Sequence, residues 1–201
     1  MGEGKRQDIR KTMTENRTAV VTRRALLGAF AATSIIAAPN YSSAFGLLRG
    51  AGDIRRIKMY SGRSGESIDT IYWVEGKYIK DALREIDYFM RDWRTNQTIS
   101  IDTRALDIMA ASYNLLGASE PYNMLSGYRT AKTNAMLRSS SRNVARNSLH
   151  IRGQAADLRL TSRSVTQLAR AAASCSAGGV GKYSRSNFVH MDCGPIRTWR
   201  G

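Results

Sequence analysis

Apolar residues change their spacing along the chain, and each spacing predicts an element. Alternation over 70–74 and 78–79, interrupted by a Glu-Gly-Lys turn, predicts a short pair of strands. Over residues 80–94 the apolar side chains recur every three or four positions, which is typical of one face of a helix. A second helix is predicted between Asp102, a residue type that caps helix starts, and Gly117, a residue type that ends helices.

Downstream of Gly117 the pattern predicts short strands separated by helices. The strand candidates are 124–128, 156–160, 179–183 and 188–193, and the helix candidates are 131–138 and 164–173. Residues before about Gly65 show no regular pattern. The predicted fold class is therefore α+β, with helices followed by a small, mostly antiparallel sheet.

The first 44 residues have the three-part pattern of an export signal. A polar, basic stretch ends at Arg23-Arg24, an apolar run follows over 28–38, and Ser42-Ser43-Ala44 supplies small residues for cleavage. The run is shorter than the ~20 residues that span a bilayer. Its paired arginines resemble a twin-arginine signal, which implies a bacterial protein exported in folded form. A Sec signal with chance arginines and an uncleaved signal anchor are the alternatives.

These boundaries predict an export signal at 1–44, a linker at 45–65 and one folded domain at 66–201. The mature domain is expected in the periplasm, an oxidising compartment, as a monomer without a transmembrane segment. With 42% apolar residues in 201, the chain has enough for a core of ordinary size, which excludes a wholly disordered protein.

The chain is strongly basic, with 31 Lys and Arg against 16 Asp and Glu and a formal charge of +15. Without residues 1–44 the balance is 24 basic against 13 acidic residues, so a charge of +11 remains. Such a field attracts polyanions, among them nucleic acid, anionic wall polymers and membrane surfaces. The basic residues of the second half are scattered singly and form no nucleic-acid-binding motif, so specific nucleic-acid recognition is not predicted.

The chain has two histidines, and both have polar neighbours suited to a site. His150 stands seven residues before Asp157, and Gly153 between them permits a turn that lets both face one point. Alternation over the strand 188–193 puts His190 and Asp192 on one face. Two imidazoles and a carboxylate form a ligand set of catalytic zinc sites, which leave a fourth position for water. By spacing alone, surface groups or hydrogen-bonded core groups are the alternative.

Several motifs resemble one enzyme family. Ser148-x-His150-x-x-Gly153-x-Ala155-x-Asp157 matches the S-x-H-x-x-G-x-A-x-D motif of the zinc D-Ala-D-Ala metallopeptidase superfamily, which shares its fold with the hedgehog signalling domain. Further segments resemble its murein endopeptidase K branch, namely 126–130 with Asn134, 178–181, 188–192 and Trp199. The resemblance covers roughly residues 60–200, and the leader also fits that branch.

By this resemblance His150, Asp157 and His190 hold one zinc ion per chain. Arg129 matches a family arginine near the metal, where a guanidinium polarises the scissile carbonyl and stabilises the oxyanion. An ordinary surface arginine is its alternative. Ser148 is expected to orient the loop or the substrate, because no base is available to activate it as a nucleophile.

The chain departs from the family at the general base. Many relatives carry Glu three residues, or His two residues, before the last ligand, where it accepts a proton from water. Here these positions are Asn187 and Phe188, and neither side chain can act as a base. Asp192 is the substitute candidate for the catalytic role, and a carboxylate that orients its neighbours is the alternative.

The expected function is zinc-dependent hydrolysis of amide bonds in the cross-linked stem peptides of peptidoglycan. A D-alanyl carboxypeptidase and a non-catalytic zinc domain that binds the cell wall are the alternatives. The bond that is cut joins either D-Ala to diaminopimelate or two diaminopimelate residues. Two further pairs are left open: Cys175 and Cys193 form a disulfide or stay as buried thiols, and Tyr183 and Trp199 line the groove or belong to the core.

Overall fold

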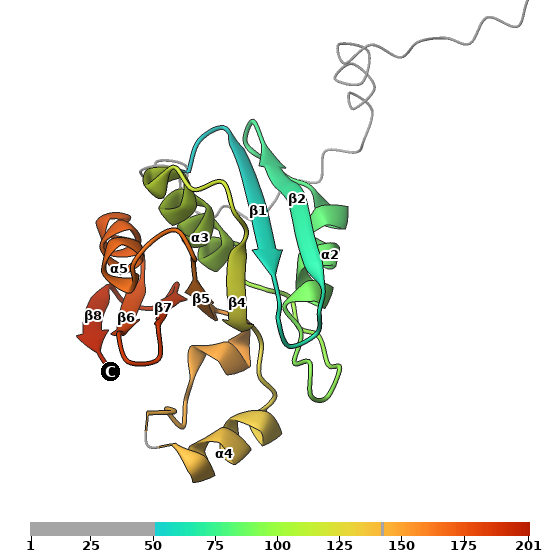
Figure 1. Cartoon of the computed structure of the whole chain (residues 1–201). Helices are drawn as coiled ribbons and strands as arrows, with labels where there is room; N and C mark the ends of the chain where they lie inside the picture. Colours follow the sequence, from blue (N-terminus) through green and yellow to red (C-terminus); the bar gives the residue numbers. More distant parts are fainter. Residues whose placement is uncertain (1–50, 142) are drawn as a thin grey trace, which may run out of the picture. The chain divides into compact units, whose positions relative to one another are not determined.

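The computed structural model describes residues 51–141 and 143–201, drawn in colour in Figure 1. The expected export signal at 1–44 lies outside these described residues. Within them the chain forms four α-helices, one 3-10 turn and a sheet of eight strands. None of the described helices has the length and apolar character needed to cross a membrane.

The elements follow in this order along the chain. They are β1 (Ile54–Tyr60), β2 (Ser67–Val74), β3 (Lys77–Tyr78), α2 (Lys80–Phe89), α3 (Thr103–Leu116), β4 (Tyr122–Ser126), α4 (Ala131–Ser140), η1 (Leu149–Arg152), β5 (Ala155–Arg159), α5 (Val165–Ser174), β6 (Gly179–Tyr183), β7 (Phe188–Asp192) and β8 (Arg197–Arg200).

The strands are arranged in the order β3-β2-β1-β4-β5-β7-β6-β8. The pairs β1/β4 and β6/β8 are parallel, and every other neighbouring pair is antiparallel. The predicted α+β class with a mostly antiparallel sheet is confirmed. The predicted order is wrong, because three strands precede the first described helix and the sheet is larger than expected.

Strand β1 lies in the stretch 45–65, for which a linker was predicted. Its inward positions Arg55, Ile57 and Met59 are all buried. Arg55 tolerates burial because its Nη1 lies 2.7 Å from Oδ2 of Asp107, another buried residue. A charged residue at an inward position hides the alternation by which a strand is identified. The linker prediction is therefore corrected over 54–60.

Three helices pack on the sheet and enclose the core. Helix α2 contacts β2, α3 contacts β1 and β7, and α5 contacts α3, β6 and β7. Leu106 and Met109 of α3 pack in one buried cluster with Leu158 of β5 and Val189 of β7. The strands that carry the predicted site residues are thereby supported on one face.

Helix ends follow the predicted capping residues where local chemistry decides. Asp102 accepts a hydrogen bond from the backbone amide of Arg104, and Gly117 ends α3 with a φ of 54°. Helix α2 stops at Phe89 instead of residue 94. The reason is a turn after it, in which the buried carboxylate of Asp92 accepts a hydrogen bond from the backbone amide of Arg94. The same carboxylate also accepts a hydrogen bond from the backbone amide of Thr130, which precedes α4.

Cys175 and Cys193 are free, buried thiols. Cys175 Sγ lies 3.7 Å from Ser112 Oγ. Burial raises the pKa of the Cys193 thiol to about 12. Of the two alternatives, the structure therefore has buried thiols and no bridge.

Candidate metal centre

One row of neighbouring residues crosses four strands of the sheet. Asp157 on β5 pairs with His190 on β7, His190 pairs with Gly181 on β6, and Gly181 pairs with Trp199 on β8. The residues on either side of Asp157 and His190 belong to the hydrophobic core. Because side chains alternate between the faces of a sheet, Asp157 and His190 project from the face opposite that core.

The third predicted ligand comes from the 3-10 turn η1. His150 is brought over the sheet by Gly153, which adopts a φ of 66°. A Cβ on Gly153 would lie 2.9 Å from the carbonyl oxygen of Ser100, so the position needs glycine for its conformation and for the close approach. The turn predicted from the sequence is confirmed.

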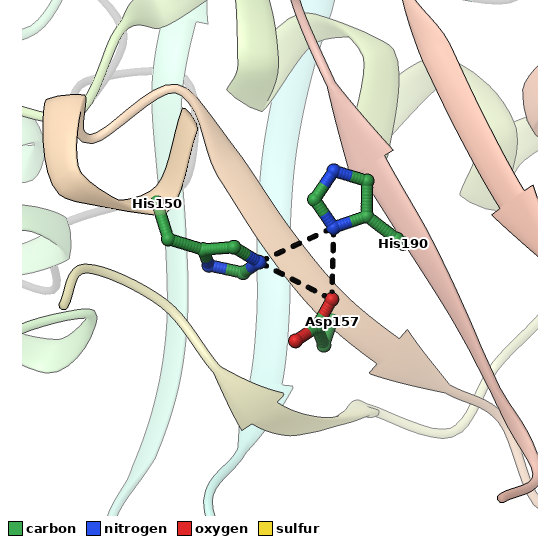
Figure 2. A group of neighbouring side chains, drawn as sticks. All are labelled: His150, Asp157 and His190. Atoms are coloured by element: carbon green, nitrogen blue, oxygen red, sulfur yellow. Dashed lines mark hydrogen bonds and ion pairs between the residues drawn. The ribbon is translucent and has the colours of Figure 1, made fainter. Parts of the chain in front are cut away.

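The three side chains converge on one point (Figure 2). His150 Nε2 lies 3.2 Å from both Asp157 Oδ1 and His190 Nδ1, and His190 Nδ1 lies 3.0 Å from Asp157 Oδ1. Among the described residues they form a group of His, Cys, Asp and Glu side chains with the geometry to hold a metal ion. The structure thus brings the predicted set together.

The other nitrogen of each imidazole has a partner that turns a lone pair toward this point. His150 Nδ1 lies 2.6 Å from the carbonyl oxygen of Gly127, so Nδ1 donates and Nε2 is left as an acceptor. His190 Nε2 lies 3.0 Å from Asp192 Oδ2, so in the neutral ring Nε2 donates and Nδ1 is left as the acceptor. Two nitrogen lone pairs and a carboxylate oxygen therefore face one another, and this donor set fits a divalent cation such as zinc.

The protonation states of His150 and Asp157 agree with this donor set, and that of His190 depends on pH. Burial lowers the pKa of His150, which keeps its imidazole neutral. Burial alone would raise the pKa of Asp157, but His150, His190 and Arg129 outweigh it and hold that pKa well below its usual range. Burial also disfavours the charged form of His190, yet the carboxylates of Asp157 and Asp192 raise its pKa to about 9. The His190 ring is therefore protonated near neutral pH, and Nδ1 has to release its proton before it can bind a cation. The centre favours bound positive charge.

Asp192 is completely buried and fully engaged. Its Oδ1 accepts hydrogen bonds from the backbone amides of Gly179 at 3.1 Å and Gly194 at 2.9 Å. Its Oδ2 contacts His190 and lies 2.8 Å from Nη2 of Arg197. Burial raises the pKa of Asp192, but His190, the Gly194 amide and Arg197 lower it below its ordinary value. The carboxylate stays ionised and has no free lone pair aimed at solvent.

Arg129 lies beside Asp157 and is 9% exposed. Its Nη2 donates a hydrogen bond to Asp157 Oδ2 and lies 3.3 Å from His150 Nε2, and its Nε donates to Ser126 Oγ at 2.7 Å. Nη1 makes no hydrogen bond or ion pair within the described part of the chain. Arg129 thus fixes the carboxylate that it contacts and keeps one nitrogen for another acceptor.

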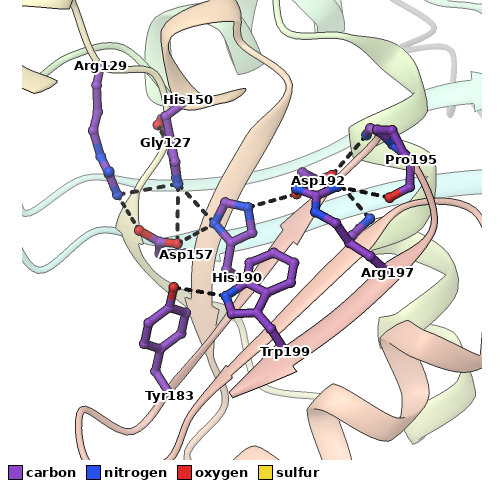
Figure 3. A network of polar contacts seen from close by, with 12 residues as sticks. Gly127, Arg129, His150, Asp157, Tyr183, His190, Asp192, Pro195, Arg197 and Trp199 are labelled. Atoms are coloured by element: carbon purple, nitrogen blue, oxygen red, sulfur yellow. Dashed lines mark hydrogen bonds and ion pairs between the residues drawn. The ribbon is translucent and has the colours of Figure 1, made fainter. Parts of the chain in front are cut away.

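Two glycines on β6 let side chains of β8 reach β7. Figure 3 shows Arg197 and Trp199 beside Asp192 and His190. A Cβ on Gly179 would lie 2.7 Å from Nη1 of Arg197, and a Cβ on Gly181 would lie 2.5 Å from the indole ring of Trp199. Without those Cβ atoms Arg197 reaches Asp192. The indole of Trp199 likewise reaches the imidazole of His190, with 5.3 Å between the ring centroids.

The centre opens into a cleft of about 550 Å³. Ser148, Tyr183 and Trp199 line it together with Arg129 and the three converging residues. The Ser148 side chain makes no hydrogen bond within 51–141 and 143–201, so no described group is placed to activate it as a nucleophile. Tyr183 and Trp199 belong to the groove, which is the first of the two alternatives for them.

Sequence reasoning missed Gly127 and Arg197. Gly127 contacts His150 through its backbone carbonyl oxygen, and every residue type has such an oxygen, so the sequence does not single this position out. Arg197 follows the last predicted strand, where a single Trp among polar residues gives no strand pattern. One signal was present: glycines alternate at positions 179 and 181 in a predicted strand, which often marks a close approach by another segment.

Comparison with known proteins agrees with the motifs. Residues 49–199 match the family model described as peptidoglycan L,D-endopeptidase MepK. The peptidoglycan L,D-endopeptidase MepK of Escherichia coli strain K12 is 43% identical over 136 residues, which are 68% of this chain and 75% of that protein. The probable peptidoglycan L,D-endopeptidase MepK of Haemophilus influenzae is 39% identical over 142 residues, which are 69% of this chain and 75% of that protein.

The family model covers well over half of the chain. The two relatives are 43% and 39% identical to it, which is high enough to show a shared family. The predicted resemblance to the murein endopeptidase K branch of the zinc D-Ala-D-Ala metallopeptidases is confirmed. This chain belongs to the peptidoglycan L,D-endopeptidase MepK family.

Proposed function

We propose that this protein is a zinc-dependent peptidoglycan endopeptidase that hydrolyses amide bonds in cross-linked stem peptides. The observation that carries the proposal is the convergence of His150 Nε2, Asp157 Oδ1 and His190 Nδ1 beside an open cleft. A zinc ion bound by two imidazoles and one carboxylate supplies a Lewis acid that polarises a carbonyl group and activates a water molecule. The relatives' names point to the same substrate.

Arg129 binds the reacting peptide group in this proposal. Its Nη2 is held by Asp157, so the guanidinium is fixed before substrate arrives, and Nη1 is available to the substrate's carbonyl oxygen. Charge that develops on that oxygen during attack strengthens the contact. The flexible ammonium group of a lysine would not replace the planar guanidinium of Arg129, which contacts Asp157 and the substrate through separate nitrogens.

Asp192 is a positioning residue rather than the proton acceptor. Its carboxylate is 0% exposed, and backbone amides, Arg197 and His190 occupy both of its oxygens. A base must come within hydrogen-bond reach of the proton that it removes. Asp192 instead fixes the ring orientation of His190 and increases the basicity of its Nδ1. Ser148 orients the loop that carries His150 or contacts substrate at the cleft wall.

The bond cut is an L,D bond, as in the relatives' names. In a D-Ala-to-diaminopimelate cross-link the carbonyl comes from a D residue, so stereochemistry favours the bond between two diaminopimelate residues. Stem peptides carry free carboxylates, which complement a domain with a net charge of +11 after residue 44. We also propose that the protein acts in the periplasm after twin-arginine export. Its fold is, in the same proposal, that of the zinc D-Ala-D-Ala metallopeptidase superfamily.

Digestion of purified sacculi tests this function. The zinc-loaded domain from residue 45 onward is expected to release soluble muropeptides and to deplete L,D cross-linked dimers, as measured by liquid chromatography with mass spectrometry. His150→Ala, which removes one ligand, is the matched inactive variant. An unchanged muropeptide profile with the zinc-loaded protein rejects hydrolysis. If the zinc-loaded protein leaves the muropeptide profile unchanged but still co-sediments with sacculi, it is a wall-binding domain. Release of D-alanine alone would identify a carboxypeptidase.

A further inference from the structure

Tyr183 stands in the cleft beside the candidate metal centre with its hydroxyl group held in place. Figure 3 shows the hydroxyl group of Tyr183, on β6, pointing toward the indole of Trp199, on β8. Trp199 Nε1 lies 3.1 Å from Tyr183 Oη. Both residues line the same cleft as Arg129, Asp157 and His190.

The direction of this hydrogen bond decides what Tyr183 can do. An indole Nε1–H can only donate, so Tyr183 Oη must be the acceptor. The phenolic proton is therefore left without a partner, since Tyr183 makes no other hydrogen bond within 51–141 and 143–201. Trp199 thus orients a free O–H donor in the cleft.

Packing fixes both rings that make this contact. Tyr183 stacks on Phe188 with 4.5 Å between ring centroids and 8° between ring planes. A Cβ at Gly201 would lie 2.3 Å from the Tyr183 ring, so that side of the ring is also closely covered. Trp199 lies over Gly181, as described above. Little rotational freedom is left to lose when substrate binds, which is a feature of preorganised hydrogen-bond donors.

We propose that Tyr183 is a catalytic residue that donates a hydrogen bond from Oη to the peptide group being hydrolysed, and that Trp199 is its positioning residue. The inference rests on the proposed function. It gives the cleft a neutral donor in addition to the cationic Arg129. A neutral phenol gains most when negative charge develops on the substrate, so its contribution lies in the rate of the bound complex.

The test compares Tyr183→Phe with Tyr88→Phe, using a soluble muropeptide dimer joined by an L,D bond. Tyr88 is 53% exposed on α2 and provides the same loss of a hydroxyl away from the cleft. Tyr183→Phe is expected to lower kcat about 100-fold with a smaller change in KM. Tyr88→Phe is expected to match the wild-type protein. Zinc content and circular dichroism are expected to be the same in all three proteins.

Trp199→Phe gives a second, independent measurement. It keeps an aromatic ring over Gly181 but removes the Nε1–H that orients the phenol. We expect kcat to fall about tenfold, because a misplaced catalytic group loses part of its effect. We also expect the additional loss from Tyr183→Phe to be smaller in this background than in the wild-type protein, since the two residues act as a unit.

Three results would overturn the proposal. The first is a Tyr183→Phe protein with kcat within twofold of the wild-type value. The second is a change in KM alone, which would make Tyr183 a ground-state contact. The third is loss of zinc in Tyr183→Phe, which would make its role structural. If the wild-type protein and Tyr88→Phe both release no product, the proposed function fails and the role of Tyr183 falls with it.

Discussion

Asp192 Oδ2 lies 3.0 Å from Nε2 of His190, and this contact leaves Nδ1 of the ring to face Asp157 and His150. The contact links a completely buried carboxylate to a residue at the edge of a cleft. It explains why His190 presents Nδ1 to the centre while His150 presents Nε2.

Replacement of Asp192 by Asn is expected to weaken zinc binding about 10- to 100-fold, because the ring of His190 loses its charged acceptor. Competition with a chromogenic chelator measures the affinity. Asp69→Asn, at a surface carboxylate that pairs with Arg56, is the matched control and should retain wild-type affinity. Equal affinities for the Asp192 and Asp69 variants would contradict the positioning role.

Arg129→Lys is expected to lower kcat about 100- to 1000-fold and to leave zinc bound, because all three ligands remain. A lysine carries the charge but cannot contact Asp157 and substrate through separate nitrogens of one plane. Steady-state kinetics on L,D cross-linked dimers measures the effect, with Arg138→Lys as the control, because Arg138 is an exposed residue of α4. A variant within threefold of wild type would exclude Arg129 from the reaction.

A buried ion pair between Arg55 and Asp107 anchors α3 to β1, outside the candidate metal centre. Asp107 is 0% exposed and accepts hydrogen bonds from Tyr72 at 2.9 Å and Tyr78 at 2.8 Å, besides pairing with Arg55. Asp107→Asn is expected to lower the free energy of unfolding by about 3–5 kcal/mol, because Arg55 would be left buried without its counter-charge.

Urea unfolding followed by fluorescence measures this loss. Asp81→Asn removes a carboxylate of the exposed Asp81–Arg84 pair and should change the free energy of unfolding by less than about 1 kcal/mol. A similar small change for Asp107→Asn would show that Arg55 finds another partner or water.

Asp92 is expected to make the stability of the fold depend on pH without involving the residues of the candidate metal centre. Burial would raise its pKa, but hydrogen bonds from Thr133, Thr130 and the Arg94 amide lower the pKa below the ordinary value of 3.8. A lowered pKa in the folded state stabilises the fold fully above the unfolded-state value, and this contribution is lost as pH falls through the folded-state pKa.

The difference in unfolding free energy between the wild-type protein and Asp92→Asn should therefore be constant above about pH 5 and shrink below about pH 4. Denaturant titrations with EDTA present, at pH 6, 5, 4 and 3, measure it without interference from bound metal. A difference that does not change with pH would mean that Asp92 keeps its ordinary pKa.

The convergence of His150, Asp157 and His190 could be predicted because the sequence pattern that indicates it is local. His150, Gly153 and Asp157 fall within eight residues. A left-handed turn favours glycine, and the glycine at position 153 is visible in the sequence. Alternation in one short strand was enough to place His190 and Asp192 on the same face. Their different roles, with His190 facing the centre and Asp192 orienting it, depend on contacts outside that strand.

The contacts that orient these residues were not predictable from local pattern. Arg197 reaches Asp192 only because β8 pairs in parallel with β6 and Gly179 leaves the space between them open. Strand β1 was missed for a related reason, since Arg55 is stabilised at an inward position by Asp107. Pairings over long sequence separation decide each of these cases, and no window of neighbouring residues contains them.

Zinc stoichiometry tests the central claim most directly. Protein reconstituted with zinc, passed through a desalting column and measured by inductively coupled plasma mass spectrometry should contain one zinc ion per chain. His150→Ala and His190→Ala should each contain less than a tenth of this amount while retaining the wild-type circular dichroism spectrum. Folded wild-type protein without zinc, or folded variants with a full complement of it, would contradict a metal centre at His150, Asp157 and His190.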